Sequence, residues 1–395
     1  MSIEALLDKF AAVSAHPKAQ LKKYKAEGKK VIGVLPYYAP EELVDAAGMV
    51  PMGVWGANDQ TISMAKEYCA SAASDVYKRQ KEYCATFYCT IAQLGLEMLL
   101  NGTLDELDGV ITPTICDTLR PMSQNIRVAM GGKMPTIFLA HPQNRFEEWG
   151  LQFTMDQYHE IKRQLEKIAS KAITPEALQA SIKLYNRYRR AARRFVELAS
   201  EHCDVITAVK RMQVLKSAWF MAKSEYTPLL EELNAELEKL PAAKWTGSKV
   251  VTSGIICDNP KLLQIFDDNH IAIAADDVAH ESRFFKTDAP ETDDPIRDLA
   301  VQFANRDHDI LLYDPQSAKN RRGEFVAELV KKSGAQGLVL FMQQFCDPEE
   351  MEYPYLKKAL DDAGIPHIKL GIDQQMRDFG QAQTAIQAFA DVLSL

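Results

Sequence analysis

The sequence predicts an α/β fold built from two Rossmann- or flavodoxin-like lobes with parallel sheets, joined by a helical region. Two observations predict this fold. Short apolar runs alternate with helical stretches in the first half and again in the last third of the chain, and a long helical stretch separates the two sets. The runs are rich in Val, Ile and Leu, which is typical of strands covered on both faces. A chain of 395 residues is long enough for two such domains.

The chain divides into four parts by pattern. Residues 1–29 have an amphipathic pattern, which predicts an N-terminal helical segment. We expect the first lobe over 30–150, the helical region over 151–246 and the second lobe over 247–395. The stretch LPAAKWTGS at 240–248 predicts the linker into the second lobe.

The apolar runs predict the strands of both sheets. In the first lobe we expect strands at Lys30–Pro36, Val50–Val54, Leu107–Thr112 and Thr136–Ala140. In the second lobe we expect them at Lys249–Ile255, Ile271–Ala274, Ile310–Tyr313, Gly337–Met342 and His367–Gly371.

A long helix is predicted to begin in the region between the lobes. Thr174 is a good N-cap, and Pro175 suits the first helical position. The same helix carries a run of arginines at Arg187, Arg189, Arg190, Arg193 and Arg194. Two interpretations stay open for this run: a solvated basic face, or a contact for coenzyme A phosphates or a partner protein.

Composition and charge exclude several classes of protein. The chain is 47% hydrophobic and 25% charged, as globular proteins are. Its net charge of −8 argues against a nucleic-acid partner, which needs a basic surface to neutralise phosphates. There is no apolar run of about 18 residues for a membrane helix, and the N-terminus lacks the apolar core of a secretory signal. We therefore expect a cytoplasmic protein.

One segment does not fit the pattern around it. The sequence KEYCA at 66–70 recurs at 81–85, and the residues between them, Ser71–Gln80, read SAASDVYKRQ. This segment resembles a translated cloning or sequencing adapter, so we interpret 71–80 as a foreign insertion. A tandem duplication is the alternative. In the first case, Cys69 and Cys84 are two copies of one native cysteine.

Two cysteines stand where ligands bind in α/β sheets. Cys116 and Cys346 each come just after a predicted strand, and each is followed by Asp. After Cys346, Asp347 and Pro348 predict a helix with Asp347 as the N-cap. We expect the helix dipole to lower the pKa of the Cys346 thiol, as a metal ligand requires.

The third member of this set is expected to be Cys84. Cys84 and Cys89 would point about 140° apart on one ideal helix, so one helix cannot easily aim both at one metal. We favour Cys84 as the ligand, Cys89 as a buried residue and Cys69 as the possible substitute for Cys84. No ferredoxin or zinc-ribbon spacing is present, and from the residues alone burial as small hydrophobes remains the alternative.

Other familiar motifs are missing from the sequence. It has no phosphate-binding loop of the G-x-x-x-x-G-K-[ST] type, no G-x-G-x-x-G fingerprint, no G-x-S-x-G and no H-E-x-x-H. Asp276 and Asp277, with Glu281 and Arg283 shortly after them, follow a predicted strand. They could line a cleft, or they could form satisfied caps and salt bridges.

Several long motifs together resemble one known family. They are VIGVLPYYAPEELVDAAGMVPMGVWG (31–56), KEYCATFYCTIAQ (81–93), DGVITPTICDTLRPMSQN (108–125), LVLFMQQFCDPEEMEYP (338–354) and GIDQQMRDFGQAQT (371–384). The chain resembles the beta subunits of the 2-hydroxyacyl-CoA dehydratases over its whole length apart from 71–80. The wider family includes the ATP-dependent benzoyl-CoA reductases.

The resemblance implies a cofactor and partners. It implies a [4Fe-4S] cluster held by Cys84, Cys116 and Cys346, with a non-cysteine ligand on the remaining iron. It also implies an alpha subunit that carries its own cluster and most of the substrate site. A separate ATP-dependent iron–sulfur activator would deliver the electron, which agrees with the missing phosphate loop. Some relatives carry a flavin, so FMN stays open although the sequence shows no motif for it.

The resemblance also implies the reaction. Water would leave (R)-2-hydroxyglutaryl-CoA in a syn-type elimination to give glutaconyl-CoA. An electron would enter the thioester carbonyl, and the resulting ketyl radical would expel the 2-hydroxyl group. This subunit's cluster would store or relay that electron. The alternatives are another acyl group, such as isocaproyl, phenyllactyl or lactoyl, or a non-catalytic electron-transfer subunit of a complex like benzoyl-CoA reductase.

Overall fold

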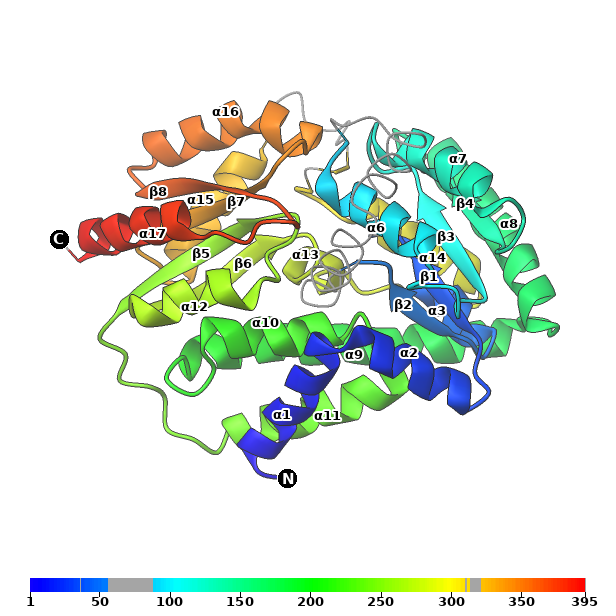
Figure 1. Cartoon of the computed structure of the whole chain (residues 1–395), viewed down its shortest axis with the longest axis horizontal. Coiled ribbons are helices and arrows are strands. Elements are labelled where there is room, and N and C mark those ends of the chain that lie inside the picture. Colours follow the sequence, from blue (N-terminus) through cyan, green and yellow to red (C-terminus); the bar gives the residue numbers. More distant parts are fainter. Residues whose placement is uncertain (36, 56–87, 310, 313–320, 395) are drawn as a thin grey trace.

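The computed structural model contains two sheets, each with four parallel strands. It describes the chain except for residues 36, 56–87, 310, 313–320 and 395. Figure 1 shows the two sheets side by side, with long helices packed below both of them. The expected α/β fold with two parallel lobes is confirmed.

The first sheet has the order β2-β1-β3-β4. Its strands are β1 (Val31–Val34), β2 (Val50–Gly53), β3 (Gly109–Pro113) and β4 (Thr136–Leu139). The helices in this part of the sequence are α3 (Glu41–Ala46), α6 (Thr90–Leu100) and α7 (Leu119–Met130). Each strand overlaps an expected one, because a short apolar run buried on both faces is a strong strand signal.

The second sheet has the order β6-β5-β7-β8. Its strands are β5 (Ser248–Gly254), β6 (Ile271–Val278), β7 (Gly337–Gln343) and β8 (His367–Ile372). The helices of this part are α12 (Pro260–Asp268), α13 (Ser282–Phe285), α14 (Pro295–Ala304), α15 (Arg322–Lys332), α16 (Asp347–Asp362) and α17 (Gly380–Leu393).

One expected strand, Ile310–Tyr313, is wrong for the residues that the structure describes. Leu311 forms a turn and Leu312 a bend, and neither pairs with the sheet. The side chain of Asp309 accepts a hydrogen bond from the Leu311 amide (2.9 Å), and its carbonyl accepts one from the Leu312 amide (3.0 Å). Such a turn closed by an aspartate competes with strand geometry, even in an apolar run.

The remaining helices form the base of both lobes. They are α1 (Ile3–Ala15) and α2 (Pro17–Ala26) at the N-terminus, then α8 (Glu148–Ala169), α9 (Pro175–Glu201), α10 (Ala208–Ser217) and α11 (Lys223–Leu237). The longest, α9, packs against α3 of the first lobe and β6 of the second. It begins as expected, with the Thr174 hydroxyl capping the Ala177 amide. Residues 241–247, within the expected linker, form no helix or strand.

Helix α14 packs on the first lobe, although it lies within the second lobe in the sequence. Its apolar residues Ile296, Leu299 and Ala300 pack in one core with Ile32 and Ile111 of the first sheet. This helix, which comes between β6 and β7 in the sequence, therefore ties the second lobe to the first lobe's core. None of the described helices is long and apolar enough to cross a membrane.

Candidate functional site

Three cysteines lie at the beginnings of three helices. Cys89 is the N-cap of α6, Cys346 is the N-cap of α16, and Cys116 lies in the turn between β3 and α7. Helices α6 and α7 follow the first lobe's strands, whereas α16 follows β7 of the second; α7 and α16 lie at the top of Figure 1, away from α9 and α11. All three cysteines are free and partly exposed, and they pack against the same hydrophobic core.

The thiols are close enough to affect one another's ionisation. Burial, with a smaller contribution from the nearby Cys116, raises the pKa of Cys89 to about 12. Burial also raises the pKa of Cys346, with contributions from Glu349, Cys89 and Cys116. Because such effects fall off with distance, they indicate that the three thiols, which come from both lobes, lie in one region of the molecule.

Backbone N–H groups point at each of the three sulfur atoms. This follows from their position, since the first amides of a helix have no partner within the helix. The donors are Ile91 and Ala92 for Cys89, Thr118 and Leu119 for Cys116, and Glu349 for Cys346. These N–H groups offset only part of the cost of burying negative charge on sulfur, so the pKa of each thiol is still raised.

Two expectations about Cys346 are wrong. Helix α16 begins one residue earlier than expected, because the Cys346 carbonyl already accepts a hydrogen bond from the Glu350 amide (3.0 Å). The pKa of Cys346 is raised, not lowered, because burial and the charge of Glu349 outweigh the helix amide. A buried thiol of this kind loses its proton when a metal takes the proton's place.

The three thiols, with backbone N–H groups beside them, are a donor set of the kind that iron–sulfur clusters use. Among the described residues, no three His, Cys, Asp or Glu side chains lie close enough to hold one ion. A four-iron cluster is larger, so its cysteines stand further apart, and it draws hydrogen bonds to its sulfur atoms. Of the residues expected as ligands, the structure brings Cys116 and Cys346 together. Cys84, Cys69 and the segment 71–80 lie outside the described residues, and Cys89 is partly exposed where we expected burial.

Three polar residues that sequence reasoning missed join the lobes beside the cysteines. The Thr90 hydroxyl accepts hydrogen bonds from Gln343 Nε2 (2.9 Å) and from the Gln374 amide (3.2 Å). Thr90 follows Cys89 in the first lobe's sequence, whereas Gln343 and Gln374 stand at or just after the ends of β7 and β8. The sequence signal was a glutamine ending an apolar run, which alone does not identify a partner.

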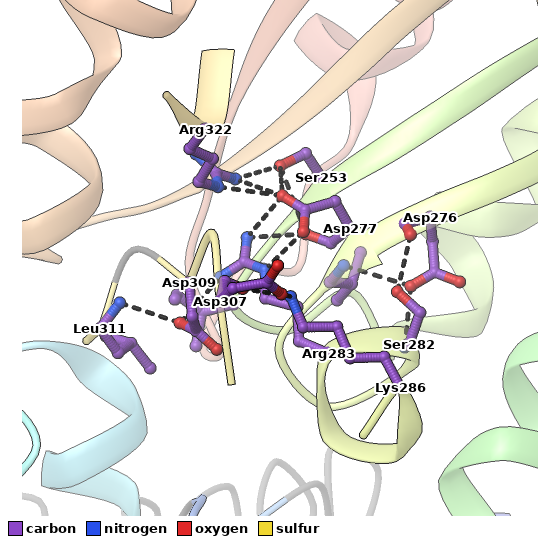
Figure 2. A network of polar contacts seen from close by, with 12 residues as sticks. Ser253, Asp276, Asp277, Ser282, Arg283, Lys286, Asp307, Asp309, Leu311 and Arg322 are labelled. Carbon is purple, nitrogen blue, oxygen red and sulfur yellow. Dashed lines mark hydrogen bonds and ion pairs between the residues drawn. The ribbon is translucent and has the colours of Figure 1, made fainter. Parts of the chain in front are cut away.

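The acidic residues after β6 form buried salt bridges. Asp277 accepts from Arg283 Nε (3.0 Å) and Arg322 Nε (2.9 Å), and Figure 2 shows this network with Asp276 beside it. Asp276 and Glu281 both pair with the buried Arg211. Of the two interpretations left open by the sequence, satisfied salt bridges are confirmed for this segment.

The arginines of α9 also pair within the chain. Arg189 forms a buried pair with Glu42, and Arg193 pairs with Asp288 (2.9 Å). Arg187 pairs with Glu231, Arg190 with Asp288, and Arg194 with Glu238. The arginine run is therefore mainly structural, and its members already have carboxylate partners.

Comparisons with known proteins give the family. The family model for the 2-hydroxyglutaryl-CoA dehydratase D-component matches residues 36–393. The beta subunit of (R)-2-hydroxyglutaryl-CoA dehydratase from Acidaminococcus fermentans is 60% identical over 394 residues, covering 100% of both chains. The (R)-phenyllactyl-CoA dehydratase beta subunit of Clostridium sporogenes is 40% identical and covers 97% of each chain. The lactoyl-CoA dehydratase beta subunit of Anaerotignum propionicum is 36% identical and covers 99% of each chain.

These matches agree with the motifs on which the fold and the cysteine site depend. The matched range contains β3 and β7 and the cysteines that follow them, Cys116 and Cys346. On this evidence of sequence and fold, the chain belongs to the 2-hydroxyglutaryl-CoA dehydratase D-component family.

Proposed function

We propose that this chain is the beta subunit of an (R)-2-hydroxyglutaryl-CoA dehydratase, a hydro-lyase that works as a heteromeric complex. The observation that carries the proposal is the 60% identity, over the full length of both chains, to a subunit of that name. The phenyllactyl-CoA relative is 40% identical and the lactoyl-CoA relative 36%, so 2-hydroxyglutaryl-CoA is favoured as substrate. The product would be glutaconyl-CoA.

The cysteine site supports a [4Fe-4S] cluster in this subunit. Cys116 and Cys346 would be two ligands, and the geometry favours Cys89 as the third. Cys89 shares the two features of the others, a position at a helix beginning and backbone N–H groups at its sulfur. Cys84, with Cys69 as its substitute, remains the alternative that the sequence suggested.

The cluster would supply single electrons at low potential, which an ordinary acid–base site cannot do. The chain's own residues would hold its ligands in place. Thr90 binds Gln343 and the Gln374 backbone, so the segment that carries Cys89 is fixed to the ends of the second lobe's strands next to Cys346. Backbone amides at the sulfurs would stabilise the more negative, reduced state.

Partners follow from the same proposal. The chain would act with an alpha subunit that provides most of the acyl-CoA site, and an ATP-dependent iron–sulfur activator would deliver the electron. A cytoplasmic location and a radical path through the thioester belong to this proposal as well, and FMN stays open. A contact with nucleic acid is not expected at a net charge of −8.

Iron and acid-labile sulfide per complex test the cluster. The chain would be produced with its alpha subunit under anaerobic conditions, with the four variants Cys84→Ser, Cys89→Ser, Cys116→Ser and Cys346→Ser. Cys203→Ser is the control, because Cys203 is buried just after the end of α9. We expect the Cys89, Cys116 and Cys346 variants to lose about four irons and the Cys84 variant to keep them.

Each other outcome has a definite meaning. Iron loss in the Cys84 variant with full iron in the Cys89 variant would reverse the assignment of the third ligand. Full iron in all four variants would refute the cluster. A version lacking residues 70–84, measured in parallel, reports on the insertion: if only this version binds iron, then 71–80 is foreign to the native protein.

Activity assays separate the dehydratase from its alternatives. A panel of glutaryl, isocaproyl, phenyllactyl and lactoyl 2-hydroxyacyl-CoA esters on the assembled complex identifies the acyl group. Dehydration that persists after Cys116→Ser, with the alpha subunit's cluster still reducible, would leave this chain a non-catalytic role. Loss of dehydration under that condition would assign it to the catalytic electron path.

A further inference from the structure

Two nitrogen atoms of the Arg306 guanidinium group are buried without a hydrogen-bond partner. Arg306 is only 5% exposed, and neither Nε nor Nη1 has an acceptor among the residues that the structure describes. The aromatic rings of Tyr38 and Phe284 lie against it, with ring centroids 4.6 and 5.6 Å from Arg306 Cζ. These ring contacts offset part of the cost of burying a charge, but they do not satisfy the two N–H groups.

The carboxylates near Arg306 are occupied by other groups. Asp309 accepts a hydrogen bond from the Tyr38 hydroxyl and lies 3.7 Å from Arg283. Glu42 forms its buried pair with Arg189. Neither carboxylate, in the part of the chain that the structure describes, is left over for the Nε and Nη1 groups of Arg306.

A small cavity opens beside this guanidinium. Polar groups line it from several elements: Tyr38, Glu42, Tyr158, Arg189, Gln302 and Arg306. These residues come from the loop after β1, from α3, α8, α9 and α14, and from the segment just after α14. The cavity thus lies where α14 packs onto the first lobe, and it contains none of the three cysteines.

The electrostatic field in this region favours an anion. Burial and the nearby charge of Arg189 lower the pKa of Arg306, but a guanidinium keeps its proton at neutral pH. His141 stacks on Phe303, a residue of the cavity wall, and both of its ring nitrogens are buried without a partner among the described residues. Burial, together with the charges of Arg306 and Arg145, lowers the pKa of His141 to about 3. The imidazole is therefore neutral and carries no charge that could balance that of Arg306.

We propose that this cavity binds a small oxyanion, foremost a monovalent carboxylate, on the guanidinium of Arg306. A planar guanidinium pairs well with a planar carboxylate, and the pair is strongest where water is excluded. The carboxylate of Glu42 in the wall disfavours a second negative charge on the ligand. The small size of the cavity excludes a nucleotide and favours the smallest carboxylates.

Thermal unfolding of the full chain, in complex with its partner subunit, tests the site. The midpoint would be measured against increasing sodium formate, acetate, phosphate and chloride at constant ionic strength. A ligand that binds only the folded state raises the midpoint with a saturable dependence, by roughly 2–4 °C well above its dissociation constant. We expect this for formate and acetate, and we expect Arg306→Met to abolish it while Arg187→Met, an exposed control, keeps it.

The four salts distinguish between the anions that the cavity could bind. Saturation by the carboxylates alone identifies a carboxylate site, and equal saturation by phosphate identifies a general oxyanion site; both support binding at Arg306. Equal, non-saturating shifts with every salt, in wild type and Arg306→Met alike, would refute it and leave water as the occupant. If Arg306→Met does not fold, saturation-transfer NMR of formate on the wild-type complex decides: transfer that acetate competes away supports the site, and no transfer refutes it.

Discussion

Replacing Asp277 by asparagine should destabilise the second lobe strongly. Asp277 is only 2% exposed, and its two carboxylate oxygens accept hydrogen bonds from Arg283 and Arg322, while Ser253 Oγ lies 3.4 Å from Oδ2 (Figure 2). Asparagine keeps the shape of the side chain but has no charge and only one acceptor oxygen. The substitution therefore leaves two buried guanidinium groups with less negative charge around them.

The expected cost follows from the burial of the network. Removing one partner of a buried ion pair costs about 3–5 kcal/mol, because the remaining charge stays buried. Asparagine still accepts one hydrogen bond, which gives an expected cost for Asp277→Asn of about 3 kcal/mol. At about 1–2 °C for each kcal/mol in a chain of this size, the midpoint of thermal unfolding should fall by about 3–6 °C.

The pH dependence gives this prediction a second readout. Burial alone would raise the pKa of Asp277, but Arg283 and Arg322 together hold it below the usual value of 3.8. A carboxyl group with a lowered folded-state pKa stabilises the fold above its unfolded-state pKa and loses that contribution as pH falls through the folded-state pKa. The gap between wild type and Asp277→Asn should thus stay constant from neutral pH to about pH 5 and close below about 3.8.

Differential scanning calorimetry on the two proteins measures the gap, with Asp288→Asn as the matched control. Asp288 also pairs with two arginines, Arg190 and Arg193, but its side chain is 32% exposed, so its loss should cost less than about 1 kcal/mol. If Asp277→Asn melts within about 2 °C of the control, the buried network does not hold the second lobe together.

Three smaller perturbations test other parts of the chain. Ser170 has a φ of 55° at the end of α8, so Ser170→Gly should raise the unfolding free energy by about 0.5–1 kcal/mol in urea titrations, whereas Ser170→Val should lower it. Thr174→Ala should cost about 1 kcal/mol by removing the cap of α9, and Thr174→Ser should restore it; equal stability of all three proteins would refute the cap. Because His141 has its pKa lowered to about 3, the fold should lose up to about 2 kcal/mol between pH 7 and 5, as the unfolded state takes up a proton near pH 6.5. His141→Phe should remove that part of the pH dependence, and an unchanged profile would contradict it.

The strands were predictable from the sequence because their signal is local. The run that forms β7 was expected at Gly337–Met342 and ends at Gln343, since each of its residues is buried and a buried parallel strand reads as a continuous apolar run. The same pattern gave a wrong prediction at Leu311 and Leu312. There the Leu311 amide donates a hydrogen bond to the Asp309 side chain, which closes a turn. A run of apolar residues tells that a segment is buried, and it does not tell which hydrogen bonds its backbone makes.

The placement of α14 and the contacts between the lobes could not be predicted in this way. The helix has an apolar face that must be buried, but nothing in its periodicity states that Ile296 and Leu299 pack on the first sheet. The hydrogen bonds from Gln343 and Gln374 to Thr90 likewise join residues that are more than two hundred positions apart. Such contacts depend on how the lobes meet, so the polar residues between the lobes and the cavity at Arg306 became visible only in three dimensions.

The third cysteine shows how one helix boundary decides a ligand assignment. If Cys84 and Cys89 lay on one helix, they would face different directions, because they are five positions apart. In the structure α6 begins at Thr90, so Cys89 is its N-cap and the rotation along a helix does not apply to it. Cys346 is likewise the N-cap of α16, and Cys116 lies two residues before Thr118, the N-cap of α7. A cysteine just before a helix can accept hydrogen bonds from the first backbone N–H groups of that helix. A cysteine within the helix cannot, because the N–H groups there already bond to carbonyls one turn earlier. The shared position, more than any spacing in the sequence, is the physical reason to expect Cys89 among the ligands.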